Sequence, residues 1–307
     1  MTASVEGLAA TYERLNADFY DADPDEYLHV RWLSLMLLAG RPDEALALLA
    51  DGVQVGHIHA SVTDGESDPE GVRDFATMES VVLLHQAAET LLRLYLAHVG
   101  RPSCPWIEVV AANQFPAFKD RVAREVVQAL DASDVDDVFL GGTGTSFKSL
   151  SEEQRATSVQ NLSSFLRVLA RKWLEDANAY NSLKHGLAAL PSAVSMSFAQ
   201  EGESLADARV LGAGPSLDFL EWVKVKARSR ALRRTTMWID VSENLALVDV
   251  SRQMIASLWV IARCRYADGP VPTGVFVPHD LTPSSLRSPN RQAARRWSMD
   301  VGVVEVK

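Results

Sequence analysis

The residues best suited to chemistry lie between Asn178 and Gly186, in the sequence NAYNSLKHG. This segment ends the longest helical pattern in the chain, and Gly186 is typical of the position after a helix. Asn181 and His185 are four residues apart, so their side chains meet on a helix. A histidine at the negative end of the helix macrodipole is favoured in its protonated form and exchanges a proton near neutral pH.

These residue types fit cleavage of RNA by attack of a 2′-hydroxyl on its own phosphate. His185 would transfer the proton, Asn181 would orient the substrate, and Lys184 would stabilise the phosphate charge. Asn178 and Arg171 lie further back on the same helix and are candidate substrate-binding residues. The mechanism requires no metal, and the sequence indicates neither a metal site nor a cofactor. The same pattern also fits the solvated face and basic end of an ordinary amphipathic helix.

A basic run, KVKARSRALRR, provides a second candidate contact with RNA. It stands out because the chain has a formal net charge of −10, which argues against a surface built throughout for nucleic acid. The candidate phosphate-binding residues of this run are Lys224, Lys226, Arg228 and Arg230. Four later arginines would extend it: Arg287, Arg291, Arg295 and Arg296. A solvated turn between two strands is the alternative interpretation.

The composition is typical of a soluble globular protein, with 47% hydrophobic and 23% charged residues among 307. Only two cysteines occur, Cys104 and Cys264, which indicates no disulfide framework and favours a reducing cytoplasm. The N-terminus has no basic apolar leader, and the longest apolar stretches are too short to cross a membrane. We therefore expect a cytoplasmic protein that does not enter the membrane.

Hydrophobic periodicity predicts that most of the chain is helical. The expected helices cover residues 5–20, 26–39, 75–98, 115–130, 151–185 and 242–266, with a further one beginning at 42. Ser151 and Gln154 form a capping-box pattern at the start of the longest one, and Ser242 to Asn244 are expected to cap the last. Residues 53–62 indicate a short strand, and the acidic residues 131–137 are assigned no element.

Short β-prone segments between residues 192 and 241 predict a small antiparallel meander. The predicted fold is therefore mainly α (α+β), a helical bundle with this meander inserted before the last long helix. The expected organisation has three parts. Residues 1–71 form an N-terminal helical segment, 72–267 the helical core with the β insertion at about 192–241, and 268–307 an irregular tail, whose final VGVVEV could add one strand.

Other motifs indicate structure and not chemistry. The loop from Gly141 to Ser149 resembles a P-loop, but Phe147 occupies the position that needs glycine for close approach to phosphate. His57 and His59 would share a strand face, and two histidines alone rarely make a metal site. His85 lies among apolar residues and is expected to be a packed core histidine.

Two helices of the chain resemble those of the HEPN superfamily. These are the apolar MESVVLLHQAAETLLRLYLAH and the later helix ending in YNSLKHG, within residues 72–190. Members are helical-bundle proteins, many of them metal-independent ribonucleases of toxin–antitoxin and phage-defence systems. Their motif is an arginine, a polar residue and then a histidine. Asn181 and His185 match it, whereas Tyr180 stands where the arginine is expected, so that either Lys184 substitutes for it or the chain is a non-cleaving, RNA-binding member.

The resemblance implies a homodimer that brings two copies of the motif together, and an antitoxin or defence partner protein. Glu79, Glu89 and Arg93 would then support the site, although Glu89 and Arg93 also have the spacing of an ordinary helical ion pair. A non-catalytic helical protein that binds a protein partner is the alternative function. Loss of RNA cleavage in His185→Ala would separate the two.

Overall fold

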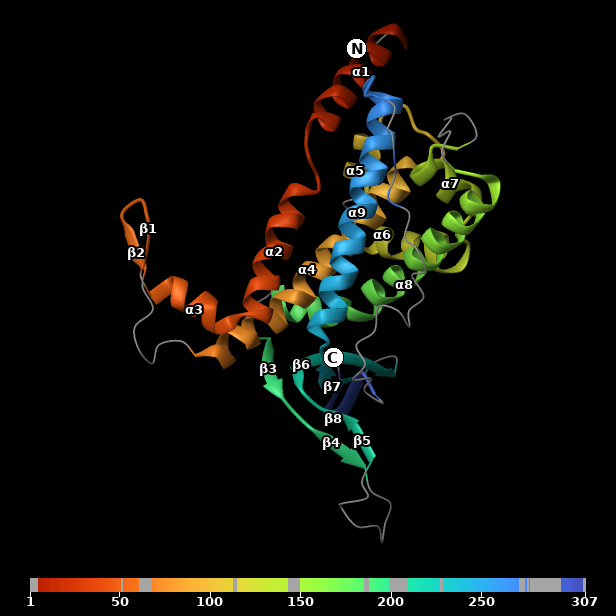
Figure 1. Cartoon of the computed structure of the whole chain (residues 1–307). Coiled ribbons are helices and arrows are strands. Elements are labelled where there is room, and N and C mark those ends of the chain that lie inside the picture. The colour runs from red at the N-terminus through yellow and green to blue at the C-terminus, as the bar shows by residue number, and fades with distance from the viewer. Residues whose placement is uncertain are drawn as a thin grey trace. The chain divides into compact units, whose positions relative to one another are not determined.

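The chain is mainly helical with a small antiparallel sheet, as the sequence predicts. The computed structural model describes residues 5–50, 52–60, 68–112, 115–142, 150–184, 188–198, 209–226, 229–270, 274, 276 and 294–305. The helices shown in Figure 1 are α1 (Val5–Asp21), α2 (Glu26–Gly40), α3 (Pro42–Ala50), α4 (Pro69–His98), α5 (Pro105–Ala111), α6 (Phe115–Arg121), α7 (Ala132–Leu140), α8 (Glu152–Lys184) and α9 (Val241–Tyr266). A π-helix, η1 (Val122–Gln128), follows α6 directly.

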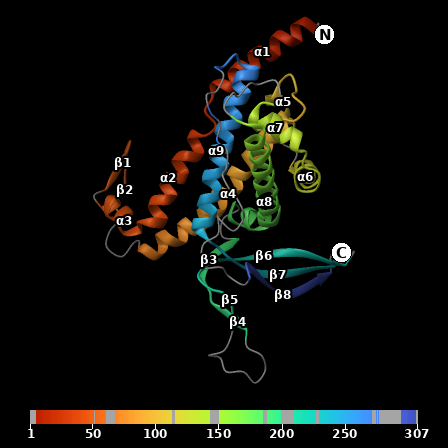
Figure 2. The same ribbon diagram turned by 45° about the vertical axis from the view of Figure 1, so that its right-hand side comes forward.

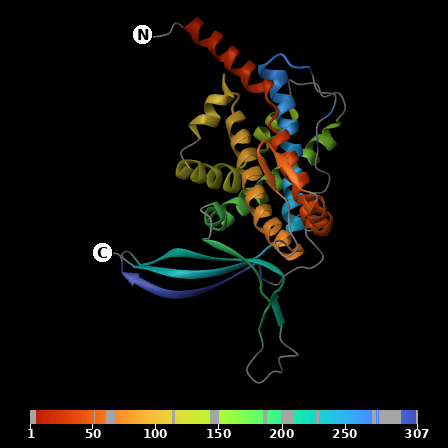
Figure 3. The same ribbon diagram turned by 90° about the vertical axis from the view of Figure 1, so that its left-hand side faces the viewer.

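The strands form one sheet and two small hairpins. They are β1 (Val53–Val55), β2 (Ile58–Ala60), β3 (Ala189–Ala193), β4 (Met196–Phe198), β5 (Arg209–Gly212), β6 (Pro215–Lys226), β7 (Ser229–Trp238) and β8 (Arg296–Glu305). The sheet has the order β3-β6-β7-β8, with antiparallel neighbours throughout. Strands β6, β7 and β8 lie side by side in Figures 2 and 3. The predicted small antiparallel sheet is therefore present, but β4 and β5 pair with each other outside it, and the C-terminal segment adds a strand that begins before VGVVEV.

The described chain divides into two compact units. The first comprises residues 1–30, 86–175 and 246–286, and the second comprises 31–85, 176–245 and 287–307. Helices α2, α4, α8 and α9 each contribute residues to both units. The three-part organisation expected from the sequence stays a prediction.

The core of the first unit contains a buried tyrosine–histidine pair. The Tyr20 hydroxyl lies 2.6 Å from Nε2 of His98, and Nδ1 of the same ring lies 2.6 Å from the carbonyl oxygen of Leu94. A carbonyl only accepts hydrogen bonds, so Nδ1 carries the hydrogen, and because burial lowers the pKa of His98 to about 4 the ring is neutral and Tyr20 donates to Nε2. Tyr266 stacks on Tyr20 with ring centroids 5.8 Å apart. The pair thus holds α1, α4 and α9 together around a neutral imidazole.

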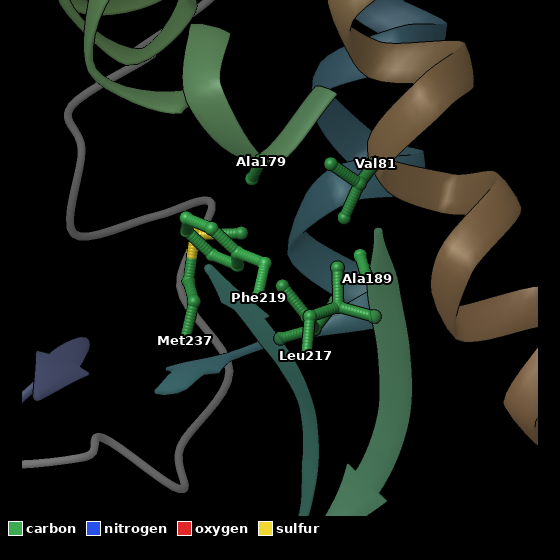
Figure 4. Close-up of a cluster of buried hydrophobic side chains, with 7 residues drawn as sticks. Val81, Ala179, Ala189, Leu217, Phe219 and Met237 are labelled. Atoms are coloured by element: carbon green, nitrogen blue, oxygen red, sulfur yellow. The ribbon is translucent and has the colours of Figure 1, made fainter. Parts of the chain in front are cut away.

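The core of the second unit joins two helices to the sheet, as Figure 4 shows. Val81 of α4 and Ala179 of α8 point toward Phe219 and Met237 of the strands. The other members of this cluster are Ala189, Leu217 and Ile239. Because side chains alternate along a strand, this packing fixes which residues of β6 and β7 face the helices. We call this the inner face of the sheet and the opposite side the outer face.

Local contacts explain where the two longest predicted helices begin. The backbone nitrogen of Ser151 donates to Gln154 Oε1 over 2.9 Å, and the Gln154 nitrogen donates to the Ser151 hydroxyl over 3.2 Å. The predicted capping box is therefore present at the start of α8. At α9 the predicted cap is wrong by two residues, because Asp240 accepts from the Glu243 nitrogen over 2.9 Å. The carboxylate of Asp240 thus performs the role expected of Ser242.

Three further expectations are corrected. Residues 53–62 were expected to form one strand but contain the β1–β2 hairpin, with His57 in its turn and His59 in β2, so the two do not share a strand face. The segment expected as one helix over 115–130 is divided between α6 and η1. The acidic segment 131–137 contains the start of α7, and Asp131, the residue before the helix, caps it by accepting from the Ser133 nitrogen.

Two other features bear on packing. Helix α9 has the length and hydropathy of a membrane span, but 67% of its most apolar window is buried within the chain, as in the core helix of a globular fold. Gly212 of β5 lies against the indole of Trp238, whose Nε1 donates to the Val194 carbonyl oxygen over 2.9 Å. A Cβ atom at Gly212 would overlap that ring.

Candidate functional site

The end of α8 is attached to the inner face of the sheet by a chain of hydrogen bonds. Asn178 Nδ2 donates to Glu221 Oε2 over 2.7 Å, and the Thr235 hydroxyl donates to Glu221 Oε1 over 2.7 Å. The Thr235 and Ser298 hydroxyls lie 2.9 Å apart. These contacts link α8 to β6, β7 and β8 in turn. Asn178, predicted to bind substrate, therefore makes a structural contact with Glu221.

A second attachment is the ion pair of Asp176. This carboxylate is only 5% exposed, and the Arg295 guanidinium donates to it. Arg296 Nη2 lies 3.8 Å from the other carboxylate oxygen. Both arginines were expected to extend the basic run toward RNA. The structure instead uses them to neutralise a buried carboxylate, which would be costly to leave unpaired.

The predicted catalytic residues are only partly described. Asn181 and Lys184 are exposed in the last turn of α8. His185 lies outside the described residues, so its role stays a prediction. Arg171 is exposed on the part of α8 that belongs to the first unit, whereas Asn181 and Lys184 belong to the second.

Tyr180, which stands in the place of the motif arginine, packs against a buried ring. Its ring stacks on that of His85, with centroids 3.9 Å apart and an interplanar angle of 12°. His85 is buried, as the sequence predicts. Glu89 and Arg93 form the ordinary helical pair, with 2.7 Å between nitrogen and oxygen, and Glu79 is bound by Arg31.

The outer face of the sheet carries exposed apolar side chains beside cations. Trp222 and Leu220 of β6 are 56% and 53% exposed, and Met299 of β8 is also exposed. The register places Leu220, Arg234 and Met299 in one row across the sheet, and Trp222, Leu232 and Gly302 in the next. The row after that contains Lys224, Arg230 and Val304.

The two cations of the third row face each other directly. Lys224 of β6 and Arg230 of β7 are register partners, both are exposed, and neither has an ion-pair partner in the described part of the chain. Arg234 differs, because Asp218 and Arg234 form an ion pair. Like charges opposite one another destabilise an antiparallel pair of strands. Lys224 and Arg230 therefore form a local positive site that a bridging anion would stabilise.

The rest of the basic run is dispersed. Arg233 belongs to the inner face, where its Nε donates to Asp300 over 2.7 Å. Lys226 is the last residue of β6 and its side chain is not among those described, while Arg228, Arg287 and Arg291 lie outside the described residues. Of the run, Lys224, Arg230 and Arg234 are thus the described cations of the outer face.

Sequence reasoning missed Trp222 and Leu220 as functional candidates. The segment FLEWVKV has apolar side chains at both alternating sets of positions, so periodicity does not show which set is buried. The available signal was the alternation of Leu220, Trp222 and Lys224, which places two large apolar groups and a cation on one strand face.

Comparison with known proteins gives no relative for this arrangement: no protein-family model, curated protein or solved structure matches the chain.

Proposed function

We propose that the chain binds RNA through the outer face of its sheet and, as a separate part of the proposal, that the end of α8, which is attached to the inner face, cleaves RNA. The observation that carries the proposal is the opposed pair Lys224 and Arg230 on an exposed strand pair. A chain with a net charge of −10 repels polyanions in general, so RNA contact requires a local site of this kind. A phosphate between the two side chains would turn their repulsion into two attractive contacts.

The proposed cleavage uses the exposed last turn of α8. His185 would remove the 2′-hydroxyl proton, and the resulting oxygen would attack phosphorus as the bond to the 5′ oxygen breaks. A proton is returned to that leaving oxygen, and the second His185 of a homodimer would supply it. Lys184 would stabilise the charge that develops on the phosphate, and Asn181 would orient it. The products are a 2′,3′-cyclic phosphate and a 5′-hydroxyl.

Binding is tested by fluorescence anisotropy of a labelled RNA over a range of salt concentrations. Log affinity falls as log salt rises, and each phosphate contact to a single strand adds about 0.7 to the steepness of that fall. We expect the double variant Lys224→Ala/Arg230→Ala to make the fall less steep by about 1.4 and to bind more weakly at low salt. Arg263→Ala is the control, because Arg263 is an exposed cation of α9 and belongs to the first unit. An unchanged slope in the double variant would exclude the pair as the phosphate site.

Cleavage is tested separately, in EDTA, with an RNA that the wild type binds. We expect His185→Ala to bind the RNA and leave it intact, whereas His57→Ala, which removes an exposed turn histidine, should cleave as the wild type does. Undiminished cleavage by His185→Ala, or none by the wild type, would remove the catalytic part of the proposal and leave RNA binding.

A second candidate function, association with a protein partner, is favoured by one observation. Leu33, Met36 and Leu37 form an exposed apolar arc on α2, and Leu48 of α3 is exposed as well. Contiguous apolar surface of this kind is typical of interaction sites. A second copy of the chain is the proposed occupant, and an antitoxin or defence protein is the alternative. Light scattering of Leu33→Glu/Leu37→Glu should then give a monomer where the wild type gives a dimer.

A further inference from the structure

We infer that the outer face of the sheet recognises single-stranded RNA by stacking a base on Trp222, next to the phosphate contact of Lys224 and Arg230. The inference rests on the proposed function and names the form of RNA that the same face takes. A cation pair binds a phosphate of any nucleic acid equally well, so charge alone does not distinguish single strands from duplexes. The stacking contact with Trp222 supplies that distinction.

The surroundings of Trp222 leave its indole accessible. Leu232 lies next to it on β7 and Gly302 follows on β8, where an added Cβ atom would meet nothing within 4 Å. Leu220, two residues before Trp222 on the same strand face, is equally exposed. The row therefore presents an exposed indole, a half-buried leucine and then a position without a side chain, so a planar group has room over the indole.

The spacing of ring and cation suits one nucleotide. Trp222 and Lys224 are two residues apart on β6, which places them about 7 Å apart along the strand. That distance is comparable with the separation between a base and its own phosphate. Each base has a π face and stacks on aromatic side chains without a sequence requirement.

A second tryptophan extends the face. Trp297 of β8 is half-buried and lies in the row of Asp218 and Thr236. It is two strands and four residues away from Trp222, a separation of about 16 Å at ordinary strand spacing and rise. At about 3.4 Å per stacked base this corresponds to about five nucleotides, within the range of single-strand binding surfaces.

The charges favour RNA over an apolar protein as the occupant. The third row holds two cations, and the only carboxylate described on the outer face rows, that of Asp218, is already engaged by Arg234 and by the Thr236 hydroxyl. Burying Lys224 and Arg230 under an apolar partner would leave both charges desolvated without compensation. A duplex also fits poorly, because its bases are stacked on one another and cannot reach the indole.

The test compares a single-stranded RNA of about ten nucleotides with a blunt-ended duplex of the same composition, by anisotropy, for five proteins. They are the wild type, Trp222→Leu, Trp222→Phe, Gly302→Glu and its control Gly40→Glu. Trp222→Leu keeps an apolar side chain at an exposed position, so it should fold, and we expect it to lower single-strand affinity about 5- to 150-fold while duplex affinity stays the same. Trp222→Phe keeps a π face and should bind between the two.

Gly302→Glu is the independent variant, because it adds a carboxylate to open space on the same face and leaves Trp222 in place. It should weaken single-strand binding, whereas Gly40→Glu, which places the same charge in open space at the end of α2, should not. Circular dichroism checks that all variants fold.

The outcomes separate the inference from the proposed function. If RNA binding depends on Lys224 and Arg230 but Trp222→Leu binds RNA as the wild type does, the stacking inference is overturned and the proposed function is not. A wild type that binds no RNA would overturn the proposed function and the inference with it. A wild-type dimer that Trp222→Leu dissociates, with RNA affinity unchanged, would assign the face to a second copy of the chain.

Discussion

The buried histidine of the first unit predicts a measurable pH dependence of stability. His98 is 2% exposed, and its two ring nitrogens are engaged by the Tyr20 hydroxyl and the Leu94 carbonyl oxygen. Burial lowers the pKa of His98 to about 4, the hydrogen bond to Leu94 acts in the opposite direction, and the charge of Arg265 acts in the same direction as burial. Protonation would also leave Nε2 and the Tyr20 hydroxyl as two donors facing one another, unless Tyr20 turns to accept.

The sign and magnitude follow from the two pKa values. An unfolded histidine has a pKa of about 6.5, so between that pH and about 4 the unfolded chain binds a proton that the folded chain does not. The free energy of unfolding therefore falls as the pH falls, by about 1.4 kcal/mol for each pH unit, and the total loss is about 3 kcal/mol near pH 4. Above about pH 6.5 this contribution is complete and constant.

Urea unfolding, followed by the near-ultraviolet circular dichroism of the aromatic cluster, measures this effect. The proteins compared are the wild type, His98→Gln and His57→Gln. At neutral pH His98→Gln should have a lower free energy of unfolding than the wild type. That difference should shrink by about 2 kcal/mol between pH 6.5 and pH 5, because the wild type loses the histidine contribution as the pH falls. His57→Gln is the matched control and should follow the wild-type pH curve. Parallel curves for the wild type and His98→Gln would refute the reasoning.

Three further expectations concern stability. Ser151→Ala removes one half of the capping box and should cost about 1 kcal/mol, measured as a lower thermal midpoint. Arg265→Ala should destabilise the chain more than Arg101→Ala. Both arginines bind Asp137, but only the side chain of Arg265 is mostly buried. The urea midpoint of Arg265→Ala should therefore be the lower of the two. Gly212→Ala forces a Cβ atom into the tryptophan ring packed against it and should lower the thermal midpoint or prevent folding, whereas the same change at the open Gly302 should be neutral.

The long helices were predictable because their signals are local and repeat many times. Helix α8 repeats its apolar positions over 33 residues, and its start is marked by side chains only three residues apart. Helix α7 was missed although its signal is of the same kind. Asp131 caps it, and Val135, Val138 and Phe139 are buried at helical spacing. The run of acidic residues concealed this short period, because Asp134, Asp136 and Asp137 lie among the apolar positions.

The sheet and its two faces were less predictable because they depend on pairing between distant segments. Strand β8 pairs with β7 across more than fifty residues of sequence, and no local pattern indicates that register. The basic run was visible in the sequence, but only the register separates Arg233, on the inner face with Asp300, from Lys224 and Arg230 on the outer face. Similarly, Arg295 and Arg296 could not be assigned to Asp176 without the fold.

The alternation of strand residues couples the end of α8, on the inner face of the sheet, to the proposed RNA-binding residues on the outer face. Glu221 points inward because Asn178 and Thr235 both donate to its carboxylate, and Trp222, the next residue, must then point outward. If β6 slipped by one residue in register, its two faces would exchange. Trp222 would then point inward and the Glu221 carboxylate would point outward. The contact that attaches α8 to the sheet therefore also fixes which side chains are presented outside. Removing it with Glu221→Ala would loosen the end of α8 and the orientation of β6 together, so loss of RNA binding in that variant would not by itself identify a binding residue.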